Sequence, residues 1–541
     1  MKLLPALFAA LLLVSPALAV DTSTPKNIGA SKVFLELNWT IEFQNGLPGS
    51  FTFRTFGFPT TNSQEARTEP GANRPFARKT DAFGNELLEF SFAPKQQTEN
   101  LVARASVDVD YANAADATGG ETPFLPQTDL TRASAGIRAK AGELRQGSGE
   151  TEAVVKMTDW VHNRVKYDGP GYGATVQNAN WVFENQVGTC DEYSHLLVSM
   201  LRSAGIPAKF IAGYVCSVNC TESANWGPHA WVEAYADGRW IATDPTFNEA
   251  ILLDATHVKF AEGTDQNDIK ESLSATPFGY SLSNVRIVRT ATVSLDDAGD
   301  FPKLFELEVA YPNATLGQGA AANITGRIRS LANKPIAVPV SLTAPAEVNV
   351  IGPAESLVFL RPGKEAVLQW QAILPNRLTD GYLYSFPIKV SALGQERDAT
   401  IKAELGGRSD KPQELHVTDV DPRVEPDGSL VVKVEFLNTG EGEVRNGRAV
   451  LETNAGTQEK RLDLEVGERG SLEFTLNPAG LRSVSGKLTV ETGTYKLGRP
   501  ILIDLPQPTP VPPATEALSD QSMLSTFDKF IKTILAFFGL G

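Results

Sequence analysis

Cys190 has the sequence setting of a reactive thiol. Apolar residues follow it at helical spacing until Gly205 and Pro207 end the pattern; these positions are Tyr193, Leu196, Leu197, Met200 and Leu201. We therefore expect Cys190 to open a helix. The positive end of the helix dipole and its free N–H groups stabilise a thiolate, so the sequence predicts a lowered pKa for Cys190 and a nucleophilic role.

His229 and Asp244 are of the right types to supply a base and the carboxylate that orients it. His229 begins a stretch, 229–236, that alternates with the period of a strand. Asp237-Gly238 then predicts a turn, and residues 239–246 predict a second strand that carries Asp244. In this hairpin Asp244 can accept a hydrogen bond from one ring nitrogen of His229 while the other nitrogen faces the sulfur.

The motifs around these three residues resemble those of the transglutaminase-like superfamily. Four segments stand in the family's order: Val-Gly-Thr-Cys190-Asp-Glu-Tyr-Ser, Ala-Gly-Ile-Pro-Ala-Lys-Phe-Ile-Ala-Gly-Tyr214, His229-Ala-Trp-Val-Glu-Ala-Tyr and Trp240-Ile-Ala-Thr-Asp244-Pro-Thr. The resemblance covers residues 122–290. It implies a papain-like α+β core in which Cys190 is the nucleophile, His229 the general base and Asp244 its orienter.

The resemblance implies a thiol acyltransferase that crosslinks or deamidates protein or peptide carboxamides. Two alternatives remain open: a cysteine peptidase or amidase with the same triad, and a non-catalytic surface or adhesion protein that only binds peptides. An acyl-transfer site also needs an oxyanion hole. For it we expect the backbone N–H of Cys190 and one side chain among Trp181, Asn185 and Gln186.

Cys216 and Cys220 lie four residues apart in a loop between the predicted strands. In an oxidising compartment this pair can close a small disulfide ring, which leaves Cys190 as the odd thiol. A zinc site would need two further ligands, and the near histidine, His229, is already assigned to the triad. We therefore favour the disulfide.

The N-terminal segment predicts export. Residues 1–19 contain one lysine, an apolar run and the small-residue sequence Ser-Pro-Ala-Leu-Ala, which together are typical of a signal peptide. We expect a secreted, extracellular or cell-surface protein. At the other end, residues 506–515 form a Pro-rich linker and residues 516–541 an amphipathic helix, for which we expect contact with a membrane surface or a partner.

The remaining chain predicts β-domains on both sides of the core. Alternating apolar residues and turn signals predict an N-terminal β-sandwich over residues 25–115. Short strands at regular spacing predict two immunoglobulin-like β-sandwiches over residues 300–405 and 412–505. The expected fold class is thus a multidomain protein with an α+β core flanked by β-sandwiches.

Charge limits the partners. The formal net charge is −15, which works against binding of nucleic acid, whose phosphates require a basic face. Acidic clusters such as Asp108, Asp110 and Asp116 lack the spacing of an EF-hand loop, so we predict no metal and no cofactor. Protein or peptide substrates are the expected partners.

Overall fold

The computed structural model describes residues 27–69, 71–168, 176–276, 280–407, 413–425, 427–481, 483–492 and 495–505. The predicted signal peptide (1–19), Pro-rich linker (506–515) and C-terminal amphipathic helix (516–541) lie outside the described residues. The chain divides into two compact units, Met1–Asp410 and Lys411–Gly541. Within the described part of the chain, no helix combines the length and the apolar character needed to cross a membrane.

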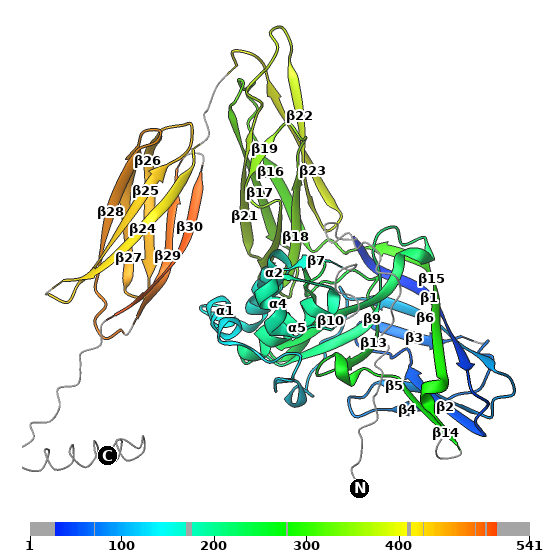
Figure 1. Cartoon of the computed structure of the whole chain (residues 1–541). Helices are drawn as coiled ribbons and strands as arrows, with labels where there is room; N and C mark the ends of the chain where they lie inside the picture. The colour runs from blue at the N-terminus through cyan, green and yellow to red at the C-terminus, as the bar shows by residue number, and fades with distance from the viewer. Residues whose placement is uncertain are drawn as a thin grey trace, which may run out of the picture. The chain divides into compact units, whose positions relative to one another are not determined.

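Two four-stranded antiparallel sheets, ordered β15-β1-β6-β3 and β14-β2-β5-β4, form a β-sandwich at the start of the first unit (Figure 1). Their strands are β1 (Ile28–Phe43), β2 (Ser50–Phe56), β3 (Gln64–Thr68), β4 (Ala77–Thr80), β5 (Glu86–Phe92), β6 (Thr98–Asp110), β14 (Ser272–Thr276) and β15 (Val285–Asp300). The alternation in β1 buries every second side chain, from Val33 to Phe43.

The last two strands of this sandwich, β14 and β15, follow the core segment in the sequence. In β1, Leu37 lies opposite Ala291 of β15 on one side and Ala103 of β6 on the other. The core segment therefore leaves the sandwich after β6 and returns to it at β14, and the expected core boundary at residue 290 falls inside β15. Periodicity predicts that a segment is a strand, but it does not name the strand's partner.

The core is a five-stranded antiparallel sheet, ordered β12-β11-β10-β9-β13, with helices on one face. The strands are β9 (Ala208–Cys216), β10 (Trp226–Ala236), β11 (Arg239–Asp244), β12 (Glu249–Ala250) and β13 (Val258–Gly263). The helices are α1 (Ala135–Arg145), α2 (Glu150–Arg164), α4 (Ala179–Asn185) and α5 (Cys190–Ser203). A short parallel pair, β7 (Lys166–Tyr167) and β8 (Val187–Gly188), precedes α5.

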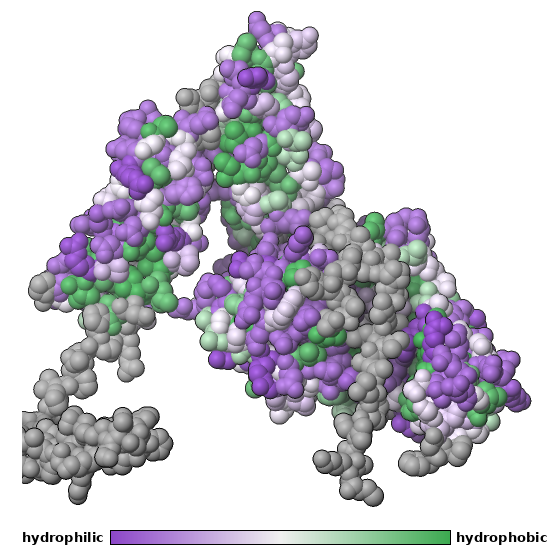
Figure 2. All heavy atoms as spheres, in the orientation of Figure 1, coloured by the Kyte–Doolittle hydropathy of each residue, from purple (hydrophilic) through white to green (hydrophobic). Residues whose placement is uncertain are grey.

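Both faces of the core sheet are buried. Val232 and Ala234 of β10 pack with the helices, while Trp231 of the same strand packs with the sandwich. Alternation along β10 thus joins two hydrophobic clusters through one sheet. On the face that Figure 2 shows, hydrophilic residues predominate over the helices, as expected for helices whose apolar side packs on a sheet.

Each C-terminal domain has two antiparallel sheets. In the first unit the sheets are β16-β17-β21-β19 and β20-β18-β22-β23, built from β16 (Phe305–Ala310), β17 (Ala321–Ser330), β18 (Ile336–Thr343), β19 (Asn349–Ile351), β20 (Glu355–Leu360), β21 (Glu365–Ile373), β22 (Tyr384–Ala392) and β23 (Gln395–Ala403). This domain contacts the core directly, since Arg361 pairs with Glu152 of α2 at 2.8 Å.

The second unit holds the sheets β24-β25-β28 and β27-β26-β29-β30. Its strands are β24 (Leu415–Val424), β25 (Leu430–Asn438), β26 (Val444–Thr453), β27 (Gly456–Leu464), β28 (Arg469–Leu476), β29 (Ser483–Glu491) and β30 (Lys496–Asp504). The protein is therefore multidomain and rich in β structure, and the immunoglobulin-like type of the two C-terminal domains stays a prediction.

Candidate active site

Cys190 is the first residue of α5, as the helical spacing predicts. Thr189 is the N-cap, and its backbone N–H donates to Oε2 of Glu192 at 2.9 Å, which closes a capping box. The helix is buried almost throughout and packs against β10 and β9. The thiol is therefore held at a rigid, well-capped helix end, where Cys190 keeps an intermediate exposure.

β10 and β11 form the predicted hairpin. Asp237 and Gly238 have φ values of 50° and 83°, the left-handed conformation that a tight hairpin turn requires at both positions. Nε2 of His229, on β10, lies 2.7 Å from Oδ2 of Asp244, at the end of β11. A carboxylate can only accept, so Nε2–H of His229 donates to Asp244.

The thiol lies against the strand that carries His229. β11 pairs with β10 only from Val232 onward, so it does not cover the backbone of Ala230. The backbone N–H of Ala230 acts on the thiol of Cys190 and lowers its pKa. The structure thus brings Cys190, His229 and Asp244 into one site, from the N-terminus of α5, from β10 and from β11.

The expected lowering of the Cys190 pKa is wrong. Burial raises the pKa of the thiol well above its ordinary value, and the charges of Asp191, Glu192 and Asp244 raise it further, against the opposing N–H of Ala230. Burial and the charge of Asp191 also raise the pKa of Glu192, to about 8. The helix dipole acts here beside several carboxylates, so the helix end alone does not make a thiolate.

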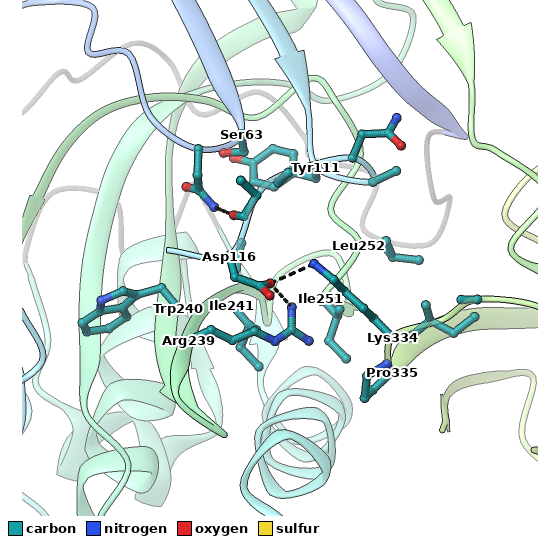
Figure 3. Close-up of a pocket in the computed structure, with 18 of the residues that line it drawn as sticks. Ser63, Tyr111, Asp116, Arg239, Trp240, Ile241, Ile251, Leu252, Lys334 and Pro335 are labelled. Carbon is teal, nitrogen blue, oxygen red and sulfur yellow. Dashed lines mark hydrogen bonds and ion pairs between the residues drawn. The ribbon is translucent and has the colours of Figure 1, made fainter. Parts of the chain in front are cut away.

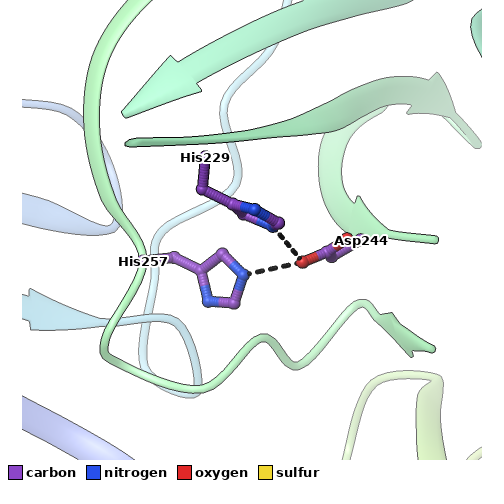
Figure 4. Close-up of side chains that lie close together, drawn as sticks. All are labelled: His229, Asp244 and His257. Atoms are coloured by element: carbon purple, nitrogen blue, oxygen red, sulfur yellow. Dashed lines mark hydrogen bonds and ion pairs between the residues drawn. The ribbon is translucent and has the colours of Figure 1, made fainter. Parts of the chain in front are cut away.

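Asp244 has two histidine partners, as Figure 4 shows. Its carboxylate is fully buried, and Nε2 of His257 lies 3.1 Å from the same Oδ2 that binds His229. Burial opposes ionisation of Asp244, but the two histidines outweigh it and hold its pKa well below the usual range. Oδ1 accepts the N–H of Thr246 at 2.7 Å, so this carboxylate is fixed in orientation.

Sequence reasoning did not find His257. It lies just before β13, in a stretch without a chemical motif, and its pairing with Asp244 arises from the fold. The one available signal is rarity, because the whole chain has only five histidines.

Within the described part of the chain, two groups of side chains have ligand atoms close enough together to hold a metal ion, within 4.8 Å of one another: His229, Asp244 and His257, and Glu249, Asp254 and His257. The ring nitrogens have other partners in this structure. Nε2 of His229 and Nε2 of His257 both face Asp244 Oδ2, and Nδ1 of His257 faces the carbonyl of Asp254 at 3.1 Å. Nitrogens that donate to oxygen have no lone pair to offer, so we assign no metal to either group.

The three expected oxyanion side chains lie around α4. Nδ2 of Asn185 donates to the carbonyl of Trp181 at 2.8 Å, so the side-chain amide of Asn185 is engaged within α4. Gln186 follows α4 in a left-handed conformation, with φ of 58°. A residue not considered from the sequence, Tyr167, interacts with the charges of the candidate site: burial raises the pKa of its phenol, and the charges of Cys190, Asp191 and Asp244 raise it further.

Cys216 and Cys220 form a disulfide with a Cα–Cα distance of 5.5 Å. It closes the loop between β9 and β10, and Nε1 of Trp226 donates to the carbonyl of Cys220 at 3.0 Å. Among the described residues Cys190 is the free cysteine.

A separate cavity of about 180 Å³ lies where the N-terminal sandwich, the core and the first C-terminal domain meet (Figure 3). Asp116 bridges Arg239 of the core, at 3.2 Å, and Lys334 of the C-terminal domain, at 3.0 Å. None of the predicted triad residues lines this cavity, so it is not the site of the expected chemistry.

Part of the chain is similar to known proteins. Residues 138–245 match the model of the Transglutaminase-like superfamily. The uncharacterized protein ML0607 of Mycobacterium leprae is 24% identical over 148 residues, which are 27% of this chain and 52% of that protein. A protein-glutamine gamma-glutamyltransferase of Pseudomonas aeruginosa is 32% identical over 123 residues, which are 21% of this chain and 18% of that protein.

The kyphoscoliosis peptidase of Mus musculus is 26% identical over 123 residues, which are 22% of this chain and 18% of the peptidase. The chain therefore spans 18% of the length of the transferase and of the peptidase, and about half of the length of ML0607.

Proposed function

Because residues 138–245 form a transglutaminase-like domain, we propose that this protein is a thiol acyltransferase acting on carboxamides of proteins or peptides. The observation that carries the proposal is the joint geometry of the site. His229 donates to Asp244 at 2.7 Å, and the backbone N–H of the residue after it, Ala230, acts on the thiol of Cys190 and lowers its pKa. This proximity supports one site that holds nucleophile, base and orienter.

His229 has to activate the thiol in this proposal. Since Nε2 of His229 is engaged with Asp244, Nδ1 is the ring nitrogen that accepts the proton of Cys190. The raised pKa of Cys190 means that a lone thiolate is scarce at neutral pH, so proton transfer to His229 accompanies the attack. Asp244 stabilises the imidazolium that forms.

The thiolate attacks the carboxamide carbon, and the C–N bond of the tetrahedral intermediate breaks as His229 returns the proton to the departing ammonia. A thioester on Cys190 results. An amine, such as a lysine side chain, then gives an isopeptide bond, and water gives a carboxylate. For the oxyanion we propose two donors, the backbone N–H of Cys190 and the phenol of Tyr167, whose pKa is raised by burial and by the charges of Cys190 and Asp244.

Hydrolysis of main-chain amides is the second candidate function. The similarity to a peptidase supports it, and the acylation step needs the same three residues. A non-catalytic peptide-binding role is the third candidate, and the raised pKa of Cys190 favours it because a neutral thiol is a poor nucleophile. Export to the cell exterior, inferred from residues 1–19, stays part of the proposal.

The test supplies a mixed protein substrate and a primary amine to the wild-type protein and to Cys190→Ala, and maps products by mass spectrometry. Amine adducts on glutamine that depend on Cys190 support the acyltransferase. New chain ends that depend on Cys190 instead support the peptidase. Equal spectra from both proteins contradict the catalytic proposal.

A further inference from the structure

His257 is buried beside the candidate triad and belongs to none of its predicted positions. Its exposed fraction is 0%, and its Nε2 shares Oδ2 of Asp244 with Nε2 of His229, at 3.1 Å and 2.7 Å respectively. The two rings lie with centroids 5.8 Å apart (Figure 4). One carboxylate oxygen thus orients two imidazoles at once.

The other ring nitrogen of His257 also faces acceptors. Nδ1 lies 3.1 Å from the carbonyl oxygen of Asp254 and 3.7 Å from its Oδ1. A carbonyl has no hydrogen to donate, and an ionised carboxylate has none either, so the hydrogens must come from the ring. With Nε2–H donated to Asp244 and Nδ1–H donated to Asp254, His257 is an imidazolium.

The groups packed around His257 favour this charge. Asp244, Asp254 and Glu249 face it, and together they outweigh burial and raise the pKa of His257 to about 10. Glu249 accepts the N–H of Asp254 at 2.9 Å, and its own pKa is raised to about 8 by burial and by Asp254. The other neighbours are Tyr111, whose hydroxyl donates to the carbonyl of His257 at 3.2 Å, and the rings of Trp231 and Phe247.

We propose that His257 is a positioning residue of the Cys190–His229–Asp244 site, which holds the Asp244 carboxylate in line with His229 and places a fixed positive charge beside the reacting pair. This inference rests on the proposed function for its role in turnover. The hydrogen bonds and the charge, in contrast, can be tested without turnover.

A fixed cation has a definite effect on its neighbours. It favours the thiolate of Cys190 over the thiol, and it disfavours the imidazolium of His229, so it lowers the pKa of both groups. Removal of the cation should therefore move both limbs of a bell-shaped pH profile toward higher pH. The His257 and His229 ring centroids are 5.8 Å apart, and for a charge at such a distance we expect a shift of about one pH unit.

The experiment measures the rate of Cys190 alkylation by iodoacetamide from pH 5 to pH 10 on the full chain. The chain has three cysteines and two of them form the disulfide, so Cys190 is the one thiol that iodoacetamide can alkylate. His257→Gln keeps a side-chain donor and removes the charge, whereas His257→Leu removes both. His195→Gln is the matched control, because His195 is also fully buried but donates to the carbonyl of Gln177, at 3.2 Å, and not to Asp244.

We expect the alkylation midpoint of His257→Gln to rise by about one pH unit, while that of His195→Gln stays with the wild type. In turnover assays His257→Gln should keep a larger share of kcat than His257→Leu, and its pH optimum should move up. A merely structural role would lower Tm in both variants and leave the alkylation midpoint unchanged. Such an unchanged midpoint in folded His257→Gln overturns the proposal.

A second measurement needs no variant. Long-range ¹H–¹⁵N spectra of the wild-type protein, labelled on histidine, distinguish an imidazolium from either neutral tautomer. We expect one buried ring to remain doubly protonated at pH 8, and five neutral rings at that pH would overturn the inference. If the wild type shows this ring but no acyl transfer, the proposed function fails and the assignment of His257 stands.

Discussion

The backbone N–H of Ala230, the residue that follows His229, acts on the thiol of Cys190 and lowers its pKa. This contact ties the N-terminus of α5 to β10 and sets nucleophile and base on adjoining elements. The β10–β11 pairing starts at Val232, so β11 does not pair with this part of β10.

Asp191→Asn should make Cys190 more reactive. After burial, the charge of Asp191 is the strongest factor that raises the pKa of Cys190, and the variant removes this charge while keeping the size of the side chain. We expect alkylation of Cys190 at pH 7 to become about 3- to 10-fold faster. Glu184→Gln, an exposed change on the neighbouring α4, is the control, and an equal rate in Asp191→Asn and wild type contradicts the assignment.

The stability of the first unit should fall as the pH rises from 6 to 9. The folded-state pKa of His257 is about 10 against an ordinary 6.5, so its stabilisation is complete below 6.5 and is lost toward 10. Glu249, with a pKa of about 8 against 4.5, keeps a proton that the unfolded chain releases, and this stabilisation is lost as the pH rises to 8. The lowered pKa of Asp244 acts in the opposite direction, but its contribution is complete above about pH 4.

Urea unfolding followed by tryptophan fluorescence measures this effect. All seven tryptophans precede residue 411, so the signal reports the first unit alone. We expect the free energy of unfolding to be lower at pH 9 than at pH 6 by at least about 1 kcal/mol. Glu249→Gln should flatten the dependence, and a wild-type protein that is more stable at pH 9 contradicts the account.

Arg202 should be essential for the stability of the core. It is only 5% exposed near the end of α5, and its guanidinium donates to four oxygens of separate segments: Pro126 O at 2.9 Å, Thr131 Oγ1 at 3.1 Å, Ala208 O at 2.8 Å and Thr264 O at 2.6 Å. Arg202→Met leaves these buried acceptors without the cation, so we expect a loss of about 3 kcal/mol or more.

Arg132→Met is the control for this prediction. The Arg132 side chain is 72% exposed and pairs with Asp129, an arrangement that contributes at most about 1 kcal/mol. Thermal unfolding of the two variants, followed by tryptophan fluorescence, checks the difference. A similar small effect in both would show that Arg202 does not tie these segments together.

Local patterns in the sequence predicted the elements that carry the site. Helical spacing predicted that α5 begins at Cys190, and strand periodicity with Asp237-Gly238 predicted the hairpin of His229 and Asp244, because both signals are encoded within a few neighbouring residues. The superfamily resemblance is confirmed for residues 138–245.

The sequence did not predict features that depend on contacts between residues far apart in the chain. The contact of His257 with Asp244 and the return of β14 and β15 to the N-terminal sandwich both join segments whose pairing no local pattern encodes. The pKa of Cys190 was predicted in the wrong direction, because the helix dipole can be read from the sequence whereas the burial of the thiol cannot.

The most direct test of the acyltransferase is to detect the acyl-enzyme itself. The protein is mixed with a glutamine-containing peptide without an added amine, quenched in acid at short times and analysed by intact-protein mass spectrometry. The account predicts an adduct equal to the peptide less one ammonia, located on Cys190, absent from Cys190→Ala and discharged by a primary amine. Unmodified Cys190 at every time, in a sample whose peptide nevertheless becomes deamidated or crosslinked, would contradict covalent catalysis by this thiol.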